Sequence, residues 1–411
     1  PNIKDQVKEI KDYGFKGIKI HPAAQELKVD GEEITEPNLD KTIPLIRGEQ
    51  GTSVTLSVLR DESEYLDISI VRDDIKVLSA TTKEFFEDMD KLSKEGRTMF
   101  GHQCSTLYGI GWSAEAGRSD IKDICGDYPA VVGWDLAEIE LGHDVNIDGD
   151  SFAAIRELIK ESYARGGITT LSWHATNPVT GGTSWDVTEA VYRIIPGGDL
   201  NTKFCGYLDK VAEFIGSLKV GNEMVPVLFR PWHEHSGSGF WWGNGNCTPE
   251  QFVALWKFTV EYLRDTKGLH NILYVFSTDI VSSQSAYLNF WPGSEWVDVL
   301  GIDAYERPGW TLPENGIRLM RLLNHISYQK NKPFAFTETG LECNDSQPQW
   351  WTNNLAASFA GLAPAYVLVW RNQSLNHYYG PYPGCVSEDD FKNFVGADNI
   401  LLESEITGIY E

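Results

Sequence analysis

The stretch RPWHEHSGSGFWWG, residues 230–243, surrounds a single carboxylate, Glu234, with histidines, tryptophans and glycines. Its histidine–glutamate pair suggests the zinc motif H-E-x-x-H, which needs a second histidine at position 237. That position is Gly237, and the SGSG run opposes the required helix, because glycine costs about 1 kcal/mol in a helix interior. We therefore expect neither a metal nor a cofactor.

A second glutamate, Glu338, lies in the segment FTETG. Glycoside hydrolysis needs two carboxyl groups, one protonated to donate to the leaving oxygen and one ionised to attack or to activate water. The aromatic rings near Glu234 would raise its pKa by desolvation and could also stack against sugar rings. Tyr305 or Arg371 could keep Glu338 ionised, by a hydrogen bond or by charge. The pair of glutamates therefore predicts a glycosidase.

Eight apolar runs, separated by helical patterns, follow one another from about residue 80. Continuous apolarity indicates strands that are buried on both faces, as in a parallel sheet. Eight such strands predict an α/β fold, the (β/α)8 TIM barrel. The runs are TMFGHQ (98–103), AVVGWDL (130–136), GITTLSWHA (167–175), MVPVLFRPWHE (224–234), ILYVFSTD (272–279), VDVLGIDAY (297–305), FAFTETG (334–340) and YVLVWRN (366–372).

Polar or aromatic side chains end all eight runs. In a TIM barrel the C-terminal ends of the strands meet at one mouth, so these side chains are expected to converge there. One polar strand end is ordinary, but eight of them indicate a ligand site. The residues are His102, Asp135, His174, Glu234, Asp279, Asp303 with Tyr305, Glu338, and Trp370 with Arg371.

Three helix starts carry capping signals. Thr248 followed by proline and by Gln251 predicts a helix from residue 249, and the run Thr81 to Glu84 predicts another. A third is expected after Ser151. The preceding DVNIDG matches the first six positions of a calcium-binding EF-hand loop, but position twelve is Ile155 instead of glutamate, so we expect a polar loop and no calcium.

The sequence resembles glycoside hydrolase family 26, a family dominated by β-mannanases, from about residue 80 to the C-terminus. The motifs that carry the resemblance are GHQ…YGIGW (101–112), DYPAVVGWDLAEIE (127–140), LSWHATNP (171–178), RPWHEHSGSGFWWG (230–243), GIDAY (301–305), FTETG (336–340) and VLVWRN (367–372). The resemblance implies a retaining barrel enzyme with Glu234, on the fourth strand, as acid/base and Glu338, on the seventh, as nucleophile.

The same resemblance implies further site residues and a substrate. Tyr305 would orient the nucleophile, and His233 takes the position before the acid/base and is counted with the substrate-binding residues. His174, Trp242, Asp279, Trp370 and Arg371 would line the sugar subsites near the cleavage point. The implied activity is endo-acting hydrolysis of β-1,4-mannosidic bonds in mannan-type polysaccharides, through a covalent glycosyl-enzyme intermediate. Two other histidines, His102 and His235, are expected to be structural.

The N-terminal fifth does not continue this pattern. We expect a small α+β appendage at residues 1–78 ahead of the catalytic domain at 79–411. Residues 28–77 resemble the C-terminal half of a PDZ domain: a strand, a helix near Asn38, then a hairpin of alternating apolar residues (Val54, Leu56, Val58; Leu66, Ile68, Ile70). The loop that would hold a peptide carboxylate is missing. Residues 1–25 resemble an amidohydrolase fragment only faintly.

Composition excludes several classes of function. A formal net charge of -24 and a pI near 4.8 oppose binding to nucleic acid, whose phosphates require a basic surface. No apolar run approaches the roughly 20 residues that span a bilayer. The chain begins at Pro1 without a signal-like segment, as in a processed product. We therefore expect a monomer that is secreted, periplasmic or at the cell surface.

Two alternatives remain open. A β-glucanase (lichenase) or a xylanase of the same family would share both glutamates, because subsite loops decide the sugar. A protein of another class, a non-catalytic polysaccharide-binding protein, would have kept the barrel without hydrolysis. Two facing carboxyl groups argue against the second alternative.

Overall fold

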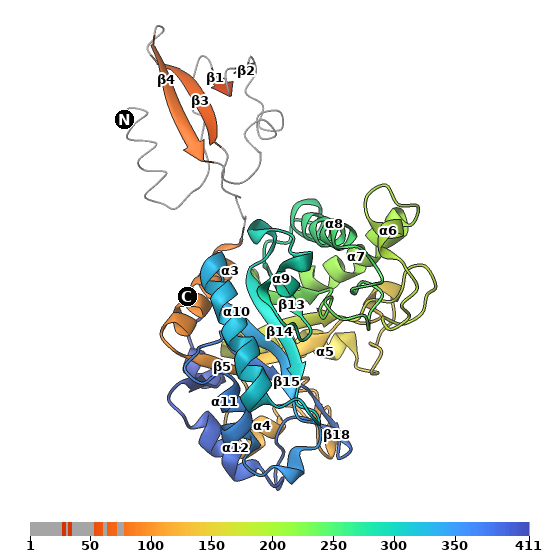
Figure 1. Ribbon diagram of the computed structural model, residues 1–411, viewed down its shortest axis with the longest axis vertical. Coiled ribbons are helices and arrows are strands. Elements are labelled where there is room, and N and C mark those ends of the chain that lie inside the picture. The colour runs from red at the N-terminus through yellow and green to blue at the C-terminus, as the bar shows by residue number, and fades with distance from the viewer. Residues whose placement is uncertain (1–26, 30–31, 35–52, 61–63, 72–77, 411) are drawn as a thin grey trace. The chain divides into compact units, whose positions relative to one another are not determined.

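The computed structural model describes residues 27–29, 32–34, 53–60, 64–71 and 78–410. The chain divides into two compact units, Pro1–Val77 and Leu78–Glu411. In the first, β1 (Leu27–Val29), β2 (Glu32–Ile34), β3 (Ser53–Arg60) and β4 (Glu64–Val71) form a sheet in the order β2-β1-β3-β4 (Figure 1).

Strands β3 and β4 pair antiparallel, with the residues of the expected hairpin opposite one another: Val54 with Ile70, Leu56 with Ile68, and Val58 with Leu66. The helix expected near Asn38 and the segment 1–25 lie outside the described residues. The likeness to a PDZ domain and to an amidohydrolase therefore stays a prediction.

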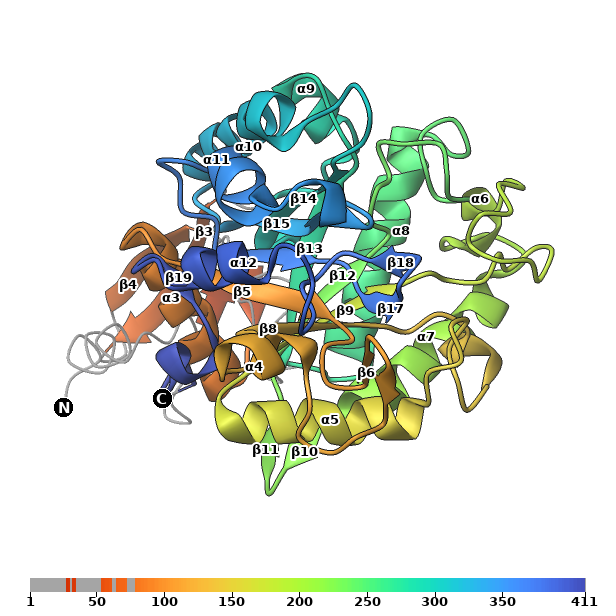
Figure 2. The same cartoon turned by 90° about the horizontal axis from the view of Figure 1, so that it is seen from below.

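Eight parallel strands close into a barrel in the second unit (Figures 1 and 2). Their order is β16-β15-β14-β13-β12-β9-β8-β5, and pairing of β16 with β5 closes the ring. Each strand lies within one of the eight predicted runs, so the predicted TIM barrel is confirmed. The strands are β5 (Thr98–Gln103), β8 (Val131–Asp135), β9 (Ile168–Trp173), β12 (Val227–Pro231), β13 (Ile272–Thr278), β14 (Val299–Tyr305), β15 (Phe334–Gly340) and β16 (Tyr366–Val369).

Helices surround these strands (Figure 2). They are α3 (Ala80–Lys94), α4 (Asp120–Cys125), α5 (Phe152–Arg165), α6 (Val191–Ile194), α7 (Asn201–Gly216), α8 (Pro249–Glu261), α9 (Gln284–Tyr287), α10 (Ile317–Lys330), α11 (Ala356–Ser358) and α12 (Glu388–Val395). Short strands are β6 (Tyr108–Gly109), β7 (Trp112–Ser113), β10 (Lys219–Val220), β11 (Glu223–Met224), β17 (Asn372–Ser374), β18 (His377–Tyr378) and β19 (Ile400–Leu401). Single turns of 3-10 or π helix are η1 (Ile139–Leu141), η2 (Tyr262–Thr266), η3 (Leu288–Phe290), η4 (Ser294–Trp296), η5 (Leu312–Gly316), η6 (Asn344–Ser346), η7 (Trp351–Leu355) and η8 (Glu403–Ile406).

Two of the three predicted helix caps are confirmed. The hydroxyl of Thr248 accepts from the backbone N–H of Gln251, and the Gln251 side chain accepts from the backbone N–H of Thr248, which completes a capping box. Ser151 caps α5. The third prediction is wrong by two residues: Ser79, not Thr81, caps α3, because Ser79 has the extended backbone of a cap and its hydroxyl accepts from the N–H of Thr82.

The amino ends of the strands are closed by apolar packing. Phe85 and Met89 of α3 are fully buried there, together with Leu401 of β19 and with Ile406. Strand β19 pairs with the first residues of β5. Ligand chemistry must therefore use the opposite end, where the long loops follow the strands.

None of the helices in the described residues is long and apolar enough to cross a membrane. All six cysteines lie in the described second unit, and each is free. Packing and hydrogen bonds hold this unit together without disulfides.

Candidate active site

Glu234 stands in a tight turn directly after β12. Trp232 and Glu234 both have left-handed backbone conformations, with φ of 54° and 53°. Such angles are uncommon outside glycine and cost energy, so the surrounding contacts must hold them. The N–H of Glu234 donates to the carbonyl of Ser277 on β13, 3.1 Å away. The turn therefore ties the carboxyl group to the neighbouring strand.

The glycines of the 230–243 segment have a packing function. A side chain at position 237 would place its Cβ 3.1 Å from a carboxylate oxygen of Asp279 and 3.4 Å from the carbonyl of Glu234. The approach to Asp279 is tighter than most real Cβ contacts, so a side chain at position 237 would require Asp279 to move by a few tenths of an ångström. Asp279 itself follows β13 and is half-buried.

Glu338, on β15, is 4% exposed and is held by two donors. The hydroxyl of Tyr305, at the end of β14, donates to Oε2 at 2.8 Å, and the guanidinium of Arg230 donates to Oε1. Hydrogen bonds from a phenol and a cation favour the ionised carboxylate. Of the two partners that the sequence suggested for this role, Tyr305 contacts Glu338, whereas the ion pair of Arg371 is with Asp148, at 2.5 Å.

Arg230 and Asp303 complete the network; the sequence placed Asp303 among the strand-end residues of the mouth but gave Arg230 no role. Arg230 donates to Asp303 at 2.6 Å, and Asp303 also accepts from Thr337 at 2.6 Å. Arg230 is 3% exposed. A charge inside the apolar run VLFRP was the available signal, since a buried arginine requires an anionic partner.

The two glutamates lie together at the mouth. Carboxylate oxygens of Glu234, Asp303 and Glu338 come within 4.8 Å of one another. Carboxyl groups about 5 to 5.5 Å apart are typical of retaining glycosidases, while inverting enzymes separate them by about 6.5 to 9.5 Å. The short separation matches the retaining arrangement and fits direct attack by one of the carboxylates.

The environments of the two glutamates differ. Burial raises the pKa of Glu234 well above its ordinary value, and repulsion from Asp303, Glu338 and Asp279 raises it further, against the opposing effect of Arg230. The surroundings of Glu234 therefore favour its protonated form, while Glu338 accepts hydrogen bonds from Tyr305 and Arg230. One carboxyl can donate a proton and the other can attack, which is the division of labour that glycosidic cleavage needs.

The three carboxylates are close enough to hold a metal ion, but the arginine between them argues against one. The guanidinium of Arg230 engages an oxygen of Asp303 and one of Glu338, so it already supplies a positive charge at this point. A cation there would face Arg230 directly.

His174 and His233 line one side of the site. His174 follows β9; its Nδ1 lies 2.7 Å from Asp135, and its Nε2 lies 3.2 Å from Nε2 of His233. His233 is 1% exposed, whereas His174 is only half-buried. The His174 ring stacks on the exposed ring of Trp185, with 5.4 Å between the ring centroids. Trp185 was not predicted from the sequence, because it lies in a loop outside the eight runs.

The aromatic residues of the 230–243 segment form a buried support. Trp242 has no exposed surface, stacks on Phe240 at 4.6 Å, and donates its indole N–H to the carbonyl of His233 at 2.8 Å. Trp241 is equally buried. These rings desolvate and brace the turn that carries Glu234. In contrast, Trp370, which follows β16, is only half-buried.

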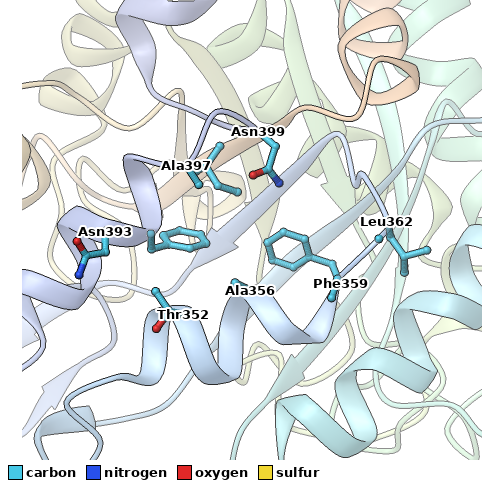
Figure 3. Close-up of a pocket in the computed structure, with 11 residues that line it drawn as sticks. Thr352, Ala356, Phe359, Leu362, Asn393, Ala397 and Asn399 are labelled. Carbon is cyan, nitrogen blue, oxygen red and sulfur yellow. The ribbon is translucent and has the colours of Figure 1, made fainter.

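A separate pocket of about 150 Å³ lies far from this chemistry (Figure 3). It is bordered by η7, α11, α12 and the segment before β19, near the amino end of β5, and Phe359 and Phe394 are among its lining residues. No ionisable side chain lines it. It therefore lacks the groups for acid–base catalysis, whereas the mouth around Glu234 and Glu338 contains them.

Known proteins with similar sequences share this architecture. The family model for Glycosyl hydrolase family 26 matches residues 77–339. A mannan endo-1,4-beta-mannosidase from Bifidobacterium adolescentis is 31% identical over 354 residues, which cover 80% of this chain and 35% of that protein. One from Bacillus subtilis is 33% identical over 248 residues, 55% of this chain and 61% of that protein.

A solved structure described as a GH26 beta-mannanase from Bacteroides ovatus is 42% identical, with a TM-score of 0.78 over 81% of this chain and 98% of that one. This chain spans about a third of the length of the first mannosidase and about three fifths of the second. The family match covers more than half of the chain and includes both glutamates, so the chain belongs to glycosyl hydrolase family 26.

Proposed function

We propose that the chain is a retaining endo-β-1,4-mannanase that hydrolyses mannan-type polysaccharides through a covalent glycosyl-enzyme intermediate. The observation that carries this proposal is the pairing of Glu234, whose pKa is raised, with Glu338, which accepts hydrogen bonds from Tyr305 and Arg230, within 4.8 Å at the barrel mouth. The names of the related mannosidases and mannanase support mannan as the substrate.

The geometry supports a two-step reaction. In the first step, Glu234 donates its proton to the glycosidic oxygen while Glu338 attacks the anomeric carbon; the carbon–oxygen bond breaks and an ester forms to Glu338. In the second, Glu234, now a carboxylate, takes a proton from water, whose oxygen displaces Glu338. Glu338 loses its negative charge when the ester forms and regains it when the ester breaks. Tyr305 and Arg230 donate hydrogen bonds that stabilise this charge.

The sugar contacts are assigned by position at the mouth. His174, Asp279, Trp370 and Arg371 follow barrel strands and retain some exposure, so they are the proposed direct contacts. His233 and Trp242 are almost completely buried. We therefore propose that these two support the subsite from behind its surface.

A place of action outside the cytoplasm is part of the proposal. Mannan-type polymers are too large to cross a membrane intact, and the net charge of -24 presents no barrier to a neutral polysaccharide. We further propose that the Leu78–Glu411 unit is the catalytic domain, that the N-terminal unit is accessory, and that the protein acts as a monomer.

The decisive substrate experiment compares linear mannan, galactomannan, lichenan and xylan, with the wild type and with Glu338→Ala. We expect manno-oligosaccharides of several lengths from the wild type and no products from the variant. Faster release of sugars from lichenan or xylan than from either mannan would contradict mannan specificity. Binding of mannan without any product would favour a binding protein.

A further inference from the structure

Asp135 is a buried carboxylate that accepts hydrogen bonds on both of its oxygens. Located at the end of β8 and 5% exposed, it accepts from Ser172 at 2.6 Å, from the backbone N–H of Ala137 at 2.8 Å, and from Nδ1 of His174 at 2.7 Å. Burial opposes its ionisation, but His174 and these hydrogen bonds outweigh burial and lower its pKa to about 2. Asp135 therefore presents a full negative charge to His174.

The other nitrogen of His174 meets a second histidine. Nε2 of His174 and Nε2 of His233 are 3.2 Å apart, so one proton must lie between them for a hydrogen bond. Burial lowers the pKa of His233 well below its ordinary value, and Arg230 lowers it further. His233 is consequently neutral, and it acts as the acceptor only if Nε2 of His174 carries the shared proton.

The charged groups around His174 come from three strands. Asp135 on β8 and Glu338 on β15 attract a positive charge on its ring, whereas Arg230 on β12 repels it. Burial by itself would lower the pKa of His174, but the contact with Asp135 raises it above the ordinary value. Stacking under Trp185, at an interplanar angle of 24°, also suits a cationic ring.

We propose that Asp135 is a positioning residue that holds His174 as an imidazolium at the barrel mouth, with Nδ1–H bonded to Asp135 and Nε2–H directed at His233. The chain Asp135–His174–His233 then ends beside Glu234, the residue that follows His233. Because both N–H groups of His174 then bond within the protein, its ring acts at the mouth through its positive charge, which attracts the oxygen ends of sugar hydroxyl dipoles.

Two other buried histidines provide internal controls. The ring of His102 bonds to the Ser105 hydroxyl at 3.0 Å, and that of His235 bonds to the carbonyl of Trp232 at 3.1 Å. Neither bonds to a carboxylate, and burial lowers the pKa of each to about 3. They are expected to stay neutral under conditions in which His174 is charged.

Nitrogen NMR of the full chain with isotope-labelled histidine tests the protonation state of His174 directly. His174→Gln assigns the His174 signals. We expect both nitrogens of His174 to be protonated at pH 6.5 in the wild type, with a titration midpoint above 6.5, and only one in Asp135→Asn, while His102 and His235 keep neutral signals in both proteins. A singly protonated His174 in the wild type at pH 6.5, or a doubly protonated one in Asp135→Asn, would overturn the proposal. The titration of His174 in the wild type tests the proposal even if Asp135→Asn does not fold.

The kinetic prediction for Asp135→Asn rests on the proposed function. The NMR measurement needs no substrate, so failure of the protonation proposal can be distinguished from failure of the proposed function. At pH 6.5 we expect KM for mannohexaose to be about tenfold higher in Asp135→Asn, with a smaller change in kcat. The difference should vanish above the His174 midpoint measured by NMR, where the wild-type ring also becomes neutral. A KM difference that persists at every pH would instead mean that Asp135 is merely structural.

Discussion

At the residue scale, the proposed mechanism depends on two glutamates with opposite environments. Glu234 is surrounded by buried rings and by other carboxylates, whereas Glu338 receives hydrogen bonds from Tyr305 and Arg230. The sequence indicated the first environment, because the aromatic residues are adjacent to Glu234 in the chain. Arg230 and Asp303 act on Glu338 across three strands, and no local pattern reports such a contact.

The pH dependence of hydrolysis should report Glu234. Its carboxyl must be protonated to donate, and its pKa is raised above the ordinary 4.5, so activity should persist well above pH 4.5 and fall as the pH rises through the raised value. The measurement is kcat/KM against pH on a soluble manno-oligosaccharide. In Glu234→Ala, assayed on an aryl mannobioside with a good leaving group, this alkaline limb should disappear. An alkaline limb with its midpoint near pH 4.5, or one that remains in Glu234→Ala, would refute the assignment of Glu234 as the proton donor.

Removing the Tyr305 hydroxyl should impair the chemical step. Tyr305→Phe deletes the 2.8 Å hydrogen bond to Glu338 and leaves the ring in place, so we expect kcat to fall about 10- to 100-fold with little change in KM. Tyr328→Phe is the matched control, because Tyr328 is 87% exposed. Equal rates for Tyr305→Phe and the wild type would show that the bond has no catalytic role.

At the element scale, the strands were predictable because each is buried on both faces and so has a continuous apolar sequence. The ends of the strands were less predictable. The run 224–234 contains only β12, Val227–Pro231: Met224 pairs in a hairpin with Lys219, and Trp232 and Glu234 take left-handed angles that end the strand. Apolarity alone does not distinguish a strand residue from a buried turn residue.

The capping box of α8 offers a test at this scale. Thr248→Ala removes the hydroxyl that accepts from Gln251, and we expect a loss of about 1 kcal/mol in the free energy of unfolding. Thr202→Ala is the control, since Thr202 is exposed inside α7 and is not its cap. Denaturant unfolding measures both. A change of the same size in the two variants would mean that the cap contributes nothing specific.

At the scale of the whole molecule, the catalytic groups all lie in the Leu78–Glu411 unit. Both glutamates, Arg230, Tyr305 and the closed ring of eight strands are within it. The sequence separated the two parts because the strand and loop pattern starts near residue 80. It could not reveal what the N-terminal part does, since its likeness to known domains covers only fragments.

Deletion of residues 1–77 tests this division. The remaining unit keeps its complete barrel and site, so kcat and KM on manno-oligosaccharides should stay within about twofold of the full chain. The thermal unfolding midpoint should be measured alongside, to show that the shortened chain is folded. A folded but inactive product would assign a catalytic role to the N-terminal unit.

The most direct test of the mechanism is to trap the covalent intermediate. A 2-deoxy-2-fluoro-β-mannosyl fluoride slows both steps, and its good leaving group allows the ester to accumulate. Peptide mapping by mass spectrometry should then find one added sugar on the peptide that contains Glu338 and none in Glu338→Ala. A label on Glu234 or Asp303, or one that persists in Glu338→Ala, would contradict the account.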